Sequence, residues 1–178
     1  AQEDERKHEI SLGAGIFSTS NLAFAYGDAI VNSIDFAGNV KFEEQVASPV
    51  FHLNYKYFTS KRFSIGVTLT AGTEKANGMA ENQYDGKLKR FYSNIAIEPV
   101  YNYINKKYFK LYLLAGAGLL YLHQDYTPEN RDKKGQTLYT FDFQLTPIGI
   151  KVGNTLGAYL EGGIGYKGII SCGVFYRF

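Results

Sequence analysis

The sequence predicts an all-β protein, an eight-stranded antiparallel up-and-down transmembrane β-barrel. Its 15 tyrosines, 13 phenylalanines and 19 glycines favour strands and tight turns. No stretch approaches the roughly 18 consecutive apolar residues of a membrane helix, so a membrane location would require a barrel. The last segment alternates with period two, with Arg177 and Ser171 on one face. The other face is an apolar row of Ile170, Cys172, Val174, Tyr176 and Phe178.

The same alternation places eight strands along the chain. They are expected at 8–17, 49–58, 62–72, 90–104, 108–122, 138–152, 155–166 and 169–178. Four of the seven connections are short: three tight turns at 60–62, 105–107 and 153–155, and the last one around 167–168. The connections at 18–48, 73–89 and 123–137 are long, and the last two of these are charged and polar. Short turns at one rim and long loops at the other are typical of bacterial outer-membrane barrels. Both termini should therefore lie on the periplasmic side.

Two prolines fall inside the expected strands. Pro99 and Pro147 each remove a hydrogen-bond donor from a closed ladder, so we expect a bulge at each. We expect one domain over residues 1–178, with the barrel at 8–178 and a periplasmic tail at 1–7. The polar start lacks an apolar signal core, as a mature exported chain would.

The apolar rows should face lipid, with aromatic girdles at both ends. One girdle would contain Tyr55, Tyr57, Tyr101, Tyr103, Phe109, Tyr176 and Phe178, and the other Phe51, Phe91, Tyr121, Tyr139 and Tyr166. A soluble lipocalin-like barrel has the same period with its faces inverted. A water-facing exterior would be rich in lysine and glutamate, whereas the row opposite the apolar one is rich in glycine. We therefore favour the membrane barrel.

The inward row carries charges that we expect to form a salt-bridge network in a narrow lumen. Its members are Glu9, Lys56, Glu98, Lys110, Asp142, Glu161 and Arg177, with Lys167 in the same row. Eight strands leave a lumen only wide enough for side chains, so these charges must be paired or hydrated. The alternative is a gate that opens by an exchange of ion-pair partners.

The outer half of the lumen is less polar, and it could form a small cup for an apolar ligand. Its lining would be Phe17, Val50, Thr68, Thr70, Leu114 and Leu120. The alternative is that Tyr92, Tyr112 and Tyr159 fill the space that the glycines leave.

Several function classes find no support in the sequence. The net charge of +2 is scattered and forms no basic stripe, which argues against nucleic acid. The three histidines are too scattered for a metal site, and we expect no cofactor. The run 163–168 has the letters of a dinucleotide fingerprint, but a strand follows it instead of a helix. No Ser/His/acid arrangement is recognisable, so we expect no enzyme.

Four segments carry a resemblance to a known family. Residues 101–108, 144–150, 160–168 and 174–178 resemble the small outer-membrane β-barrel proteins of Bacteroides-type bacteria. The resemblance implies a bacterial outer-membrane location and the barrel fold. It also implies that the terminal row of Ile170, Cys172, Val174, Tyr176 and Phe178 is the signal read by the outer-membrane assembly machinery.

We therefore expect a structural or surface-interaction protein that acts through its outer loops. A narrow carrier or binder of small apolar molecules is the first alternative, and a lipid-modifying outer-membrane enzyme the second. The expected partners are outer-membrane lipids, the assembly machinery and a surface partner or small apolar ligand. We expect a monomer.

Overall fold

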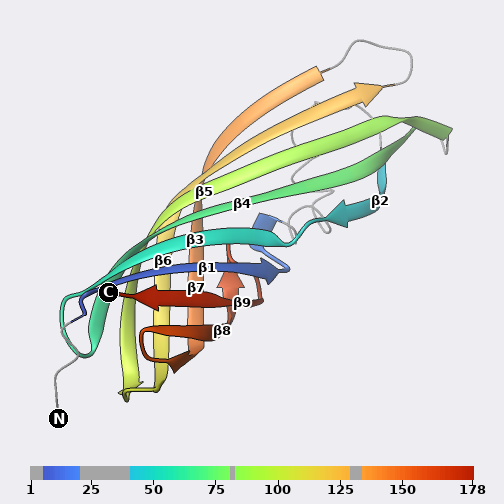
Figure 1. Cartoon of the computed structure of the whole chain (residues 1–178). Coiled ribbons are helices and arrows are strands. Elements are labelled where there is room, and N and C mark those ends of the chain that lie inside the picture. The colour runs from blue at the N-terminus through green and yellow to red at the C-terminus, as the bar shows by residue number, and fades with distance from the viewer. Residues whose placement is uncertain (1–5, 21–40, 81–82, 129–133) are drawn as a thin grey trace.

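The computed structural model describes residues 6–20, 41–80, 83–128 and 134–178. Nine antiparallel strands lie within these ranges (Figure 1). They are β1 (His8–Ile16), β2 (Lys41–Ala47), β3 (Val50–Phe58), β4 (Phe63–Ala80), β5 (Gln83–Asn105), β6 (Phe109–Pro128), β7 (Lys134–Gly153), β8 (Leu156–Gly165) and β9 (Ile170–Arg177). Among the described residues, no helix has the length and apolar character needed to cross a bilayer.

Eight of these strands close into a barrel, which confirms the predicted fold. The order is β3-β1-β9-β8-β7-β6-β5-β4, and β4 then pairs with β3. The remaining strand, β2, lies beside the outer part of β4 and continues the line of β3. Ala47 of β2 pairs with Glu74, and Phe51 of β3 pairs with Ala71. The sheet therefore has no free edge around the barrel itself.

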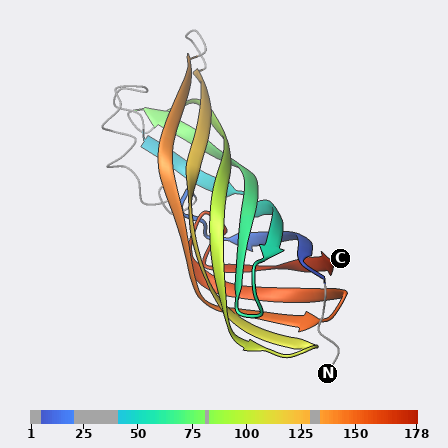
Figure 2. The same ribbon diagram turned by 90° about the vertical axis from the view of Figure 1, so that its left-hand side faces the viewer.

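Four strands are much longer than the others, and they project past one rim of the barrel (Figures 1 and 2). The predicted loop 73–89 is mostly strand, since β4 runs to Ala80 and β5 starts at Gln83. The predicted loop 123–137 is likewise strand up to Pro128 and from Lys134 onward. In the predicted loop 18–48, β2 occupies 41–47, and residues 21–40 lie outside the described part. Polar composition misled the prediction because these hairpins lie outside the apolar span and need no apolar row.

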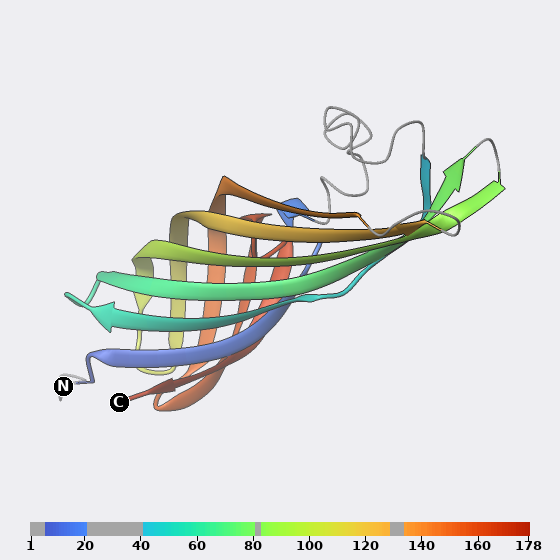
Figure 3. The same cartoon turned by 90° about the horizontal axis from the view of Figure 1, so that it is seen from above.

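The start of β1 and the end of β9 lie at the opposite rim, beside the short turns (Figure 3). The backbone N–H of His8 donates to the carbonyl of Phe178 at 3.0 Å, which joins β1 to the end of the chain. The predicted tail 1–7 is described only from Arg6. Its guanidinium donates to Asn154 Oδ1 at 2.8 Å in the β7–β8 turn, so this part of the tail is held against the barrel.

The faces of the strands follow the predicted alternation, except near the C-terminal ends of β5 and β7, where the register shifts. Glu98, Lys110 and Glu161 are buried inside the barrel, which excludes the lipocalin-like inversion. The exterior is apolar because each strand turns its aliphatic and aromatic row outward. The terminal row belongs to this exterior, and its exposed members include Ile170, Val174, Tyr176 and Phe178.

One predicted bulge is confirmed and the other is wrong. The pairing of β7 shifts by one residue around Pro147 against both neighbours, β6 and β8. The strand thus bulges where the proline cannot donate. Pro99 pairs with Ile65 in unbroken register, and the bulge of β5 lies at Tyr103 instead.

Candidate functional site

The barrel interior holds two layers of buried ion pairs, of which the first lies near the short-turn rim. Glu9 of β1 accepts from Arg177 of β9 at 2.6 Å and from Lys151 of β7. Glu9 and Arg177 are direct partners in the β1–β9 ladder, whereas Lys151 reaches Glu9 from a strand that is not its neighbour. All three side chains are almost fully buried. A single carboxylate therefore joins three strands across the lumen.

The second layer is centred on Lys167, which comes from the turn between β8 and β9. Its Nζ lies 2.8 Å from Glu98 Oε1 and 3.4 Å from Glu161 Oε2. The turn bends into the barrel through Gly165 and Gly168, whose φ angles of 141° and 101° disfavour other residues. The outer turn thus places the ammonium group of Lys167 between two carboxylates inside the barrel.

Tyrosines surround the second layer and donate to the same carboxylates. Tyr112 donates to Glu161 at 2.7 Å, and Tyr166 donates to Glu98 at 2.8 Å. Their rings occupy space that glycines leave, because a Cβ on Gly149 would lie 2.3 Å from the ring of Tyr112. A Cβ on Gly116 would lie 2.1 Å from the hydroxyl of Tyr166. The packing of the tyrosine rings against glycines therefore holds their hydroxyl donors beside the two carboxylates.

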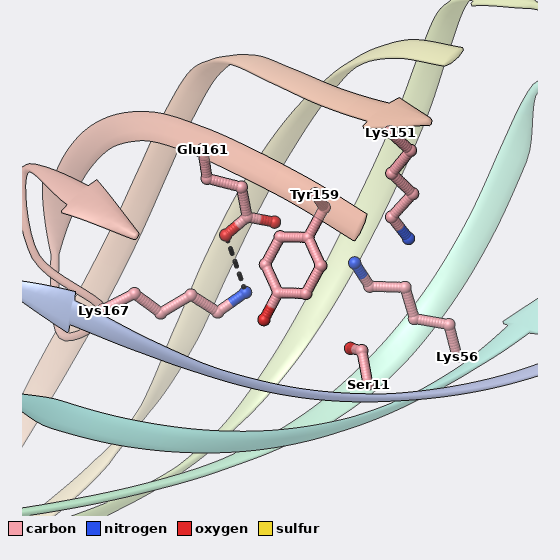
Figure 4. A pocket seen from close by; sticks show the side chains of 6 residues that line it. All are labelled: Ser11, Lys56, Lys151, Tyr159, Glu161 and Lys167. Carbon is pink, nitrogen blue, oxygen red and sulfur yellow. Dashed lines mark hydrogen bonds and ion pairs between the residues drawn. The ribbon is translucent and has the colours of Figure 1, made fainter. Parts of the chain in front are cut away.

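A narrow gap remains between the two layers (Figure 4). It has no space that a water molecule could occupy. Figure 4 shows Lys56 and Lys151 on one side of Tyr159, with Glu161 and Lys167 on the other. The lining residues are Ser11, Lys56, Lys151, Tyr159, Glu161 and Lys167.

The predicted network residues fall into different environments. Glu9, Glu98, Glu161 and Arg177 belong to the two layers, as described above. Lys56 is buried with its Nζ 5.4 Å from the centre of the Tyr112 ring. Lys110 lies closer to the short-turn rim, 5.3 Å from the centre of the Phe58 ring.

Asp142 stands apart from both layers. It accepts from the Thr19 hydroxyl at 3.0 Å and from the backbone N–H of Phe143 at 2.8 Å. It therefore fastens the segment after β1 to β7 at the outer end of the barrel.

The residues expected to line an apolar cup are also divided. Val50, Thr68, Thr70 and Leu114 are buried within the barrel. Leu120 is half-buried, nearer the mouth. Phe17 is not a lining residue, because its side chain is 56% exposed and its backbone has a positive φ of 59°. The strand has already ended there, so the period-two argument no longer applies.

Two lysines of these layers, Lys151 and Lys167, were not among the residues predicted for the charge network. Lys151 has the parity of an outward residue when counted from Asp142, but the bulge at Pro147 reverses the faces beyond it. The signal was present, since a bulge at Pro147 was expected. Lys167 was placed in the inward row, but its sequence position near a turn gave no sign that the turn folds inward.

A smaller buried polar group lies in the projecting part of the sheet. Arg90 of β5 donates to Glu74 of β4 at 3.2 Å and to Gln124 of β6 at 3.3 Å. These side chains share the inner face with the buried Ala76, Leu88 and Tyr126. The projection is therefore packed on its inner face.

Comparison with known proteins identifies the fold. No protein-family description and no curated protein sequence matches the chain. The crystal structure of Ail, the attachment invasion locus protein of Yersinia pestis, in complex with the heparin analogue sucrose octasulfate, matches with a TM-score of 0.50 and 12% identity over 97% of both chains. A second crystal structure of Ail gives a TM-score of 0.47 and 13% identity over 97% of both chains. The N-terminal β-barrel domain of Pseudomonas aeruginosa OprF gives 0.46 and 15% over 97% of this chain and 98% of that one.

These findings define the class of protein. A closed antiparallel barrel with an apolar exterior and buried charges is the architecture of outer-membrane β-barrels, in which lipid-facing and lumen-facing residues alternate. The chain is an eight-stranded outer-membrane β-barrel, located in the outer membrane of a Gram-negative bacterium.

Proposed function

We propose that this barrel is a non-conducting membrane scaffold with a structural or surface-interaction role exerted through its outer strands. The observation that carries the proposal is the double layer of ion pairs. Glu9, Glu98 and Glu161 each meet at least one buried cation, and the gap between the layers has no room for water. A lumen filled in this way supports neither ion flow nor the entry of a substrate.

The projecting sheet supports the surface role. β4, β5, β6 and β7 extend past the barrel rim opposite the termini, which in this class is the extracellular side (Figure 2). A rigid sheet with a packed inner face presents its loops at fixed positions, and binding commonly resides in loops on such a scaffold. Ail is described in complex with a heparin analogue, and we extend surface binding to this chain only as part of the proposal.

We propose a monomer that is not an enzyme, belongs to the Bacteroides-type family of small barrels, and is assembled through its terminal aromatic row. The aromatic girdles remain a proposal as well. The proposal prefers a filled lumen to an apolar-ligand cup because tyrosine rings occupy the space beside glycines: a Cβ on Gly72 would lie 2.3 Å from the ring of Tyr92.

Conductance in a planar lipid bilayer tests the closed lumen. The wild-type barrel should give no stable open level. A variant that removes both layers, with alanine in place of Glu9, Lys151, Arg177, Glu98, Glu161 and Lys167, should conduct if these side chains are what closes the lumen, provided that its heat-dependent gel shift verifies a folded barrel. A stable open level of the wild type that vanishes in Arg177→Ala would contradict the proposal, because that cluster would then be part of a conducting path.

Adhesion of whole cells tests the surface role. Cells that display the wild type would be compared with cells that display a variant in which a two-residue turn replaces residues 77–87 and joins the ladder partners Ala76 and Leu88. Both would be tested for adhesion to a panel of immobilised surface glycans and matrix proteins. Binding should fall for the shortened variant at equal surface display. Equal binding of the wild type and the shortened variant to every panel member would contradict the surface-interaction role and would support a purely structural one.

A further inference from the structure

Three lysines gather on the outward face of the projecting sheet. Lys75 of β4 and Lys89 of β5 are direct partners in the ladder, and Lys87 lies two residues from Lys89 on the same face. All three side chains are exposed. Direct partners in an antiparallel pair have Cβ atoms roughly 5 Å apart, so two ammonium groups can reach one small anion.

Among the side chains that the structure describes, this lysine cluster keeps an excess of positive charge. No ion pair joins Lys75, Lys87 or Lys89 to another residue in the described part of the chain. Asp125 of β6 is the ladder partner of Lys89, so it supplies one carboxylate against the three ammonium groups. Arg90 and Glu74 are buried on the opposite face. Like charges directly opposite each other in a sheet are destabilising, and a bound anion would offset that repulsion.

The depth of the cluster matches the outer interface of the bilayer. Residues 63–73 of β4 number eleven, about the length of strand that crosses the hydrocarbon region. Thr73 pairs with Phe91, which is 44% exposed, and Lys75 and Lys89 follow directly on the outer side. The lysines thus stand where lipid phosphates lie, directly above apolar wall residues such as Leu69 and Ile95.

We propose that Lys75, Lys87 and Lys89 bind the phosphate of an anionic lipid in the outer leaflet. Lysine binds phosphate as a point charge on a flexible stem, and three such stems converge on this face. The acyl chains of the same lipid would lie against the exposed Leu69, Ile95 and Leu119. This combination of a cationic head site and a continuous apolar wall fits a membrane lipid better than a soluble anion.

Native mass spectrometry of the full chain in a non-ionic detergent tests the proposal. The probe is bisphosphorylated lipid A, compared with the same lipid after dephosphorylation. The test variant carries Lys75→Gln, Lys87→Gln and Lys89→Gln. The control carries Lys61→Gln, Lys106→Gln and Lys107→Gln, which remove the same charge from exposed lysines at the other rim. A heat-dependent gel shift verifies that each variant is folded.

The wild type and the control should retain the phosphorylated lipid, and the test variant should bind it roughly tenfold or more weakly. The dephosphorylated lipid should bind equally weakly to all three. Equal retention by the test variant, or an equal loss in the control, would overturn the proposal. Displacement of the lipid by millimolar inorganic phosphate would assign the site to a free anion. Binding of sucrose octasulfate in preference to the lipid would assign it to a sulfated glycan, and either result overturns the lipid assignment.

Discussion

Lys167 and Glu98 form an ion pair of 2.8 Å inside the barrel, although Lys167 belongs to a turn at the outer rim. The backbone N–H of Lys167 also donates to the Gln144 side chain at 2.8 Å, so the turn is held from β7 as well as from the lumen. The β8–β9 turn is therefore part of the interior. Its position depends on the carboxylates that it neutralises.

Lys167→Met should destabilise the barrel by about 3–5 kcal/mol, because Glu98 and Glu161 would lose a buried cation. Urea titration of the refolded protein in lipid vesicles measures the change. Lys106→Met, in an exposed turn, is the control and should change stability by less than about 0.5 kcal/mol. Adding Glu98→Gln and Glu161→Gln to Lys167→Met should recover much of the loss. No recovery would mean that the cost of Lys167→Met comes from packing alone.

The packing of tyrosine against glycine gives a second prediction. Gly149→Ala places a Cβ 2.3 Å from the ring of Tyr112, which cannot retreat freely because its hydroxyl is bonded to Glu161. We expect a loss of about 1–3 kcal/mol, the usual range for overpacking. In Gly162→Ala the nearest atom is 3.9 Å from the new Cβ, so the variant should be close to neutral. Equal unfolding midpoints for the two variants would contradict the assigned packing.

The barrel itself could be predicted from the sequence because a membrane barrel repeats one simple pattern. Within residues 63–72 every second side chain is apolar, and the structure turns Phe63, Ile65, Val67 and Leu69 outward as expected. Beyond Thr73 that pattern stops, because the strand leaves the hydrocarbon and its outward face needs no apolar side chains. Sequence alone therefore cannot separate a polar strand from a polar loop there.

The interior was only partly predictable for a different reason. Parity from Asp142 assigns Lys151 to the exterior, and only the bulge at Pro147 returns it to the lumen. One inserted residue exchanges the two faces of the rest of a strand. Which prolines cause bulges is decided by the pairing around them, as the unbroken register at Pro99 demonstrates. The partners of Glu9 therefore required the three-dimensional structure.

The bulge can be tested with two cysteines of equal parity. Thr146 is buried inside the barrel, whereas Ile148, two residues on, is exposed on the outside. In a Cys172→Ala background, a lipid-soluble maleimide should label Ile148→Cys in vesicles and leave Thr146→Cys unlabelled until urea unfolds the barrel. Labelling measured by intact mass decides the matter. Equal labelling of both folded variants would mean that β7 is regular and that Lys151 faces lipid.

Charge placed on the apolar wall should destabilise the fold according to its depth. Ile97 is 56% exposed and pairs with Val67, near the middle of the residues 63–73 that cross the hydrocarbon. Leu156 is 69% exposed at the start of β8, beside a short turn. Ile97→Arg should cost about 2–4 kcal/mol in vesicles, and Leu156→Arg about 0–1 kcal/mol. If the wall faced water and not lipid, both variants would lose little stability. Equal small costs in vesicles would therefore contradict a lipid-facing exterior. A larger cost for Ile97→Arg instead follows directly from hydrocarbon at that depth, because arginine at the bilayer centre has no water to hydrate it.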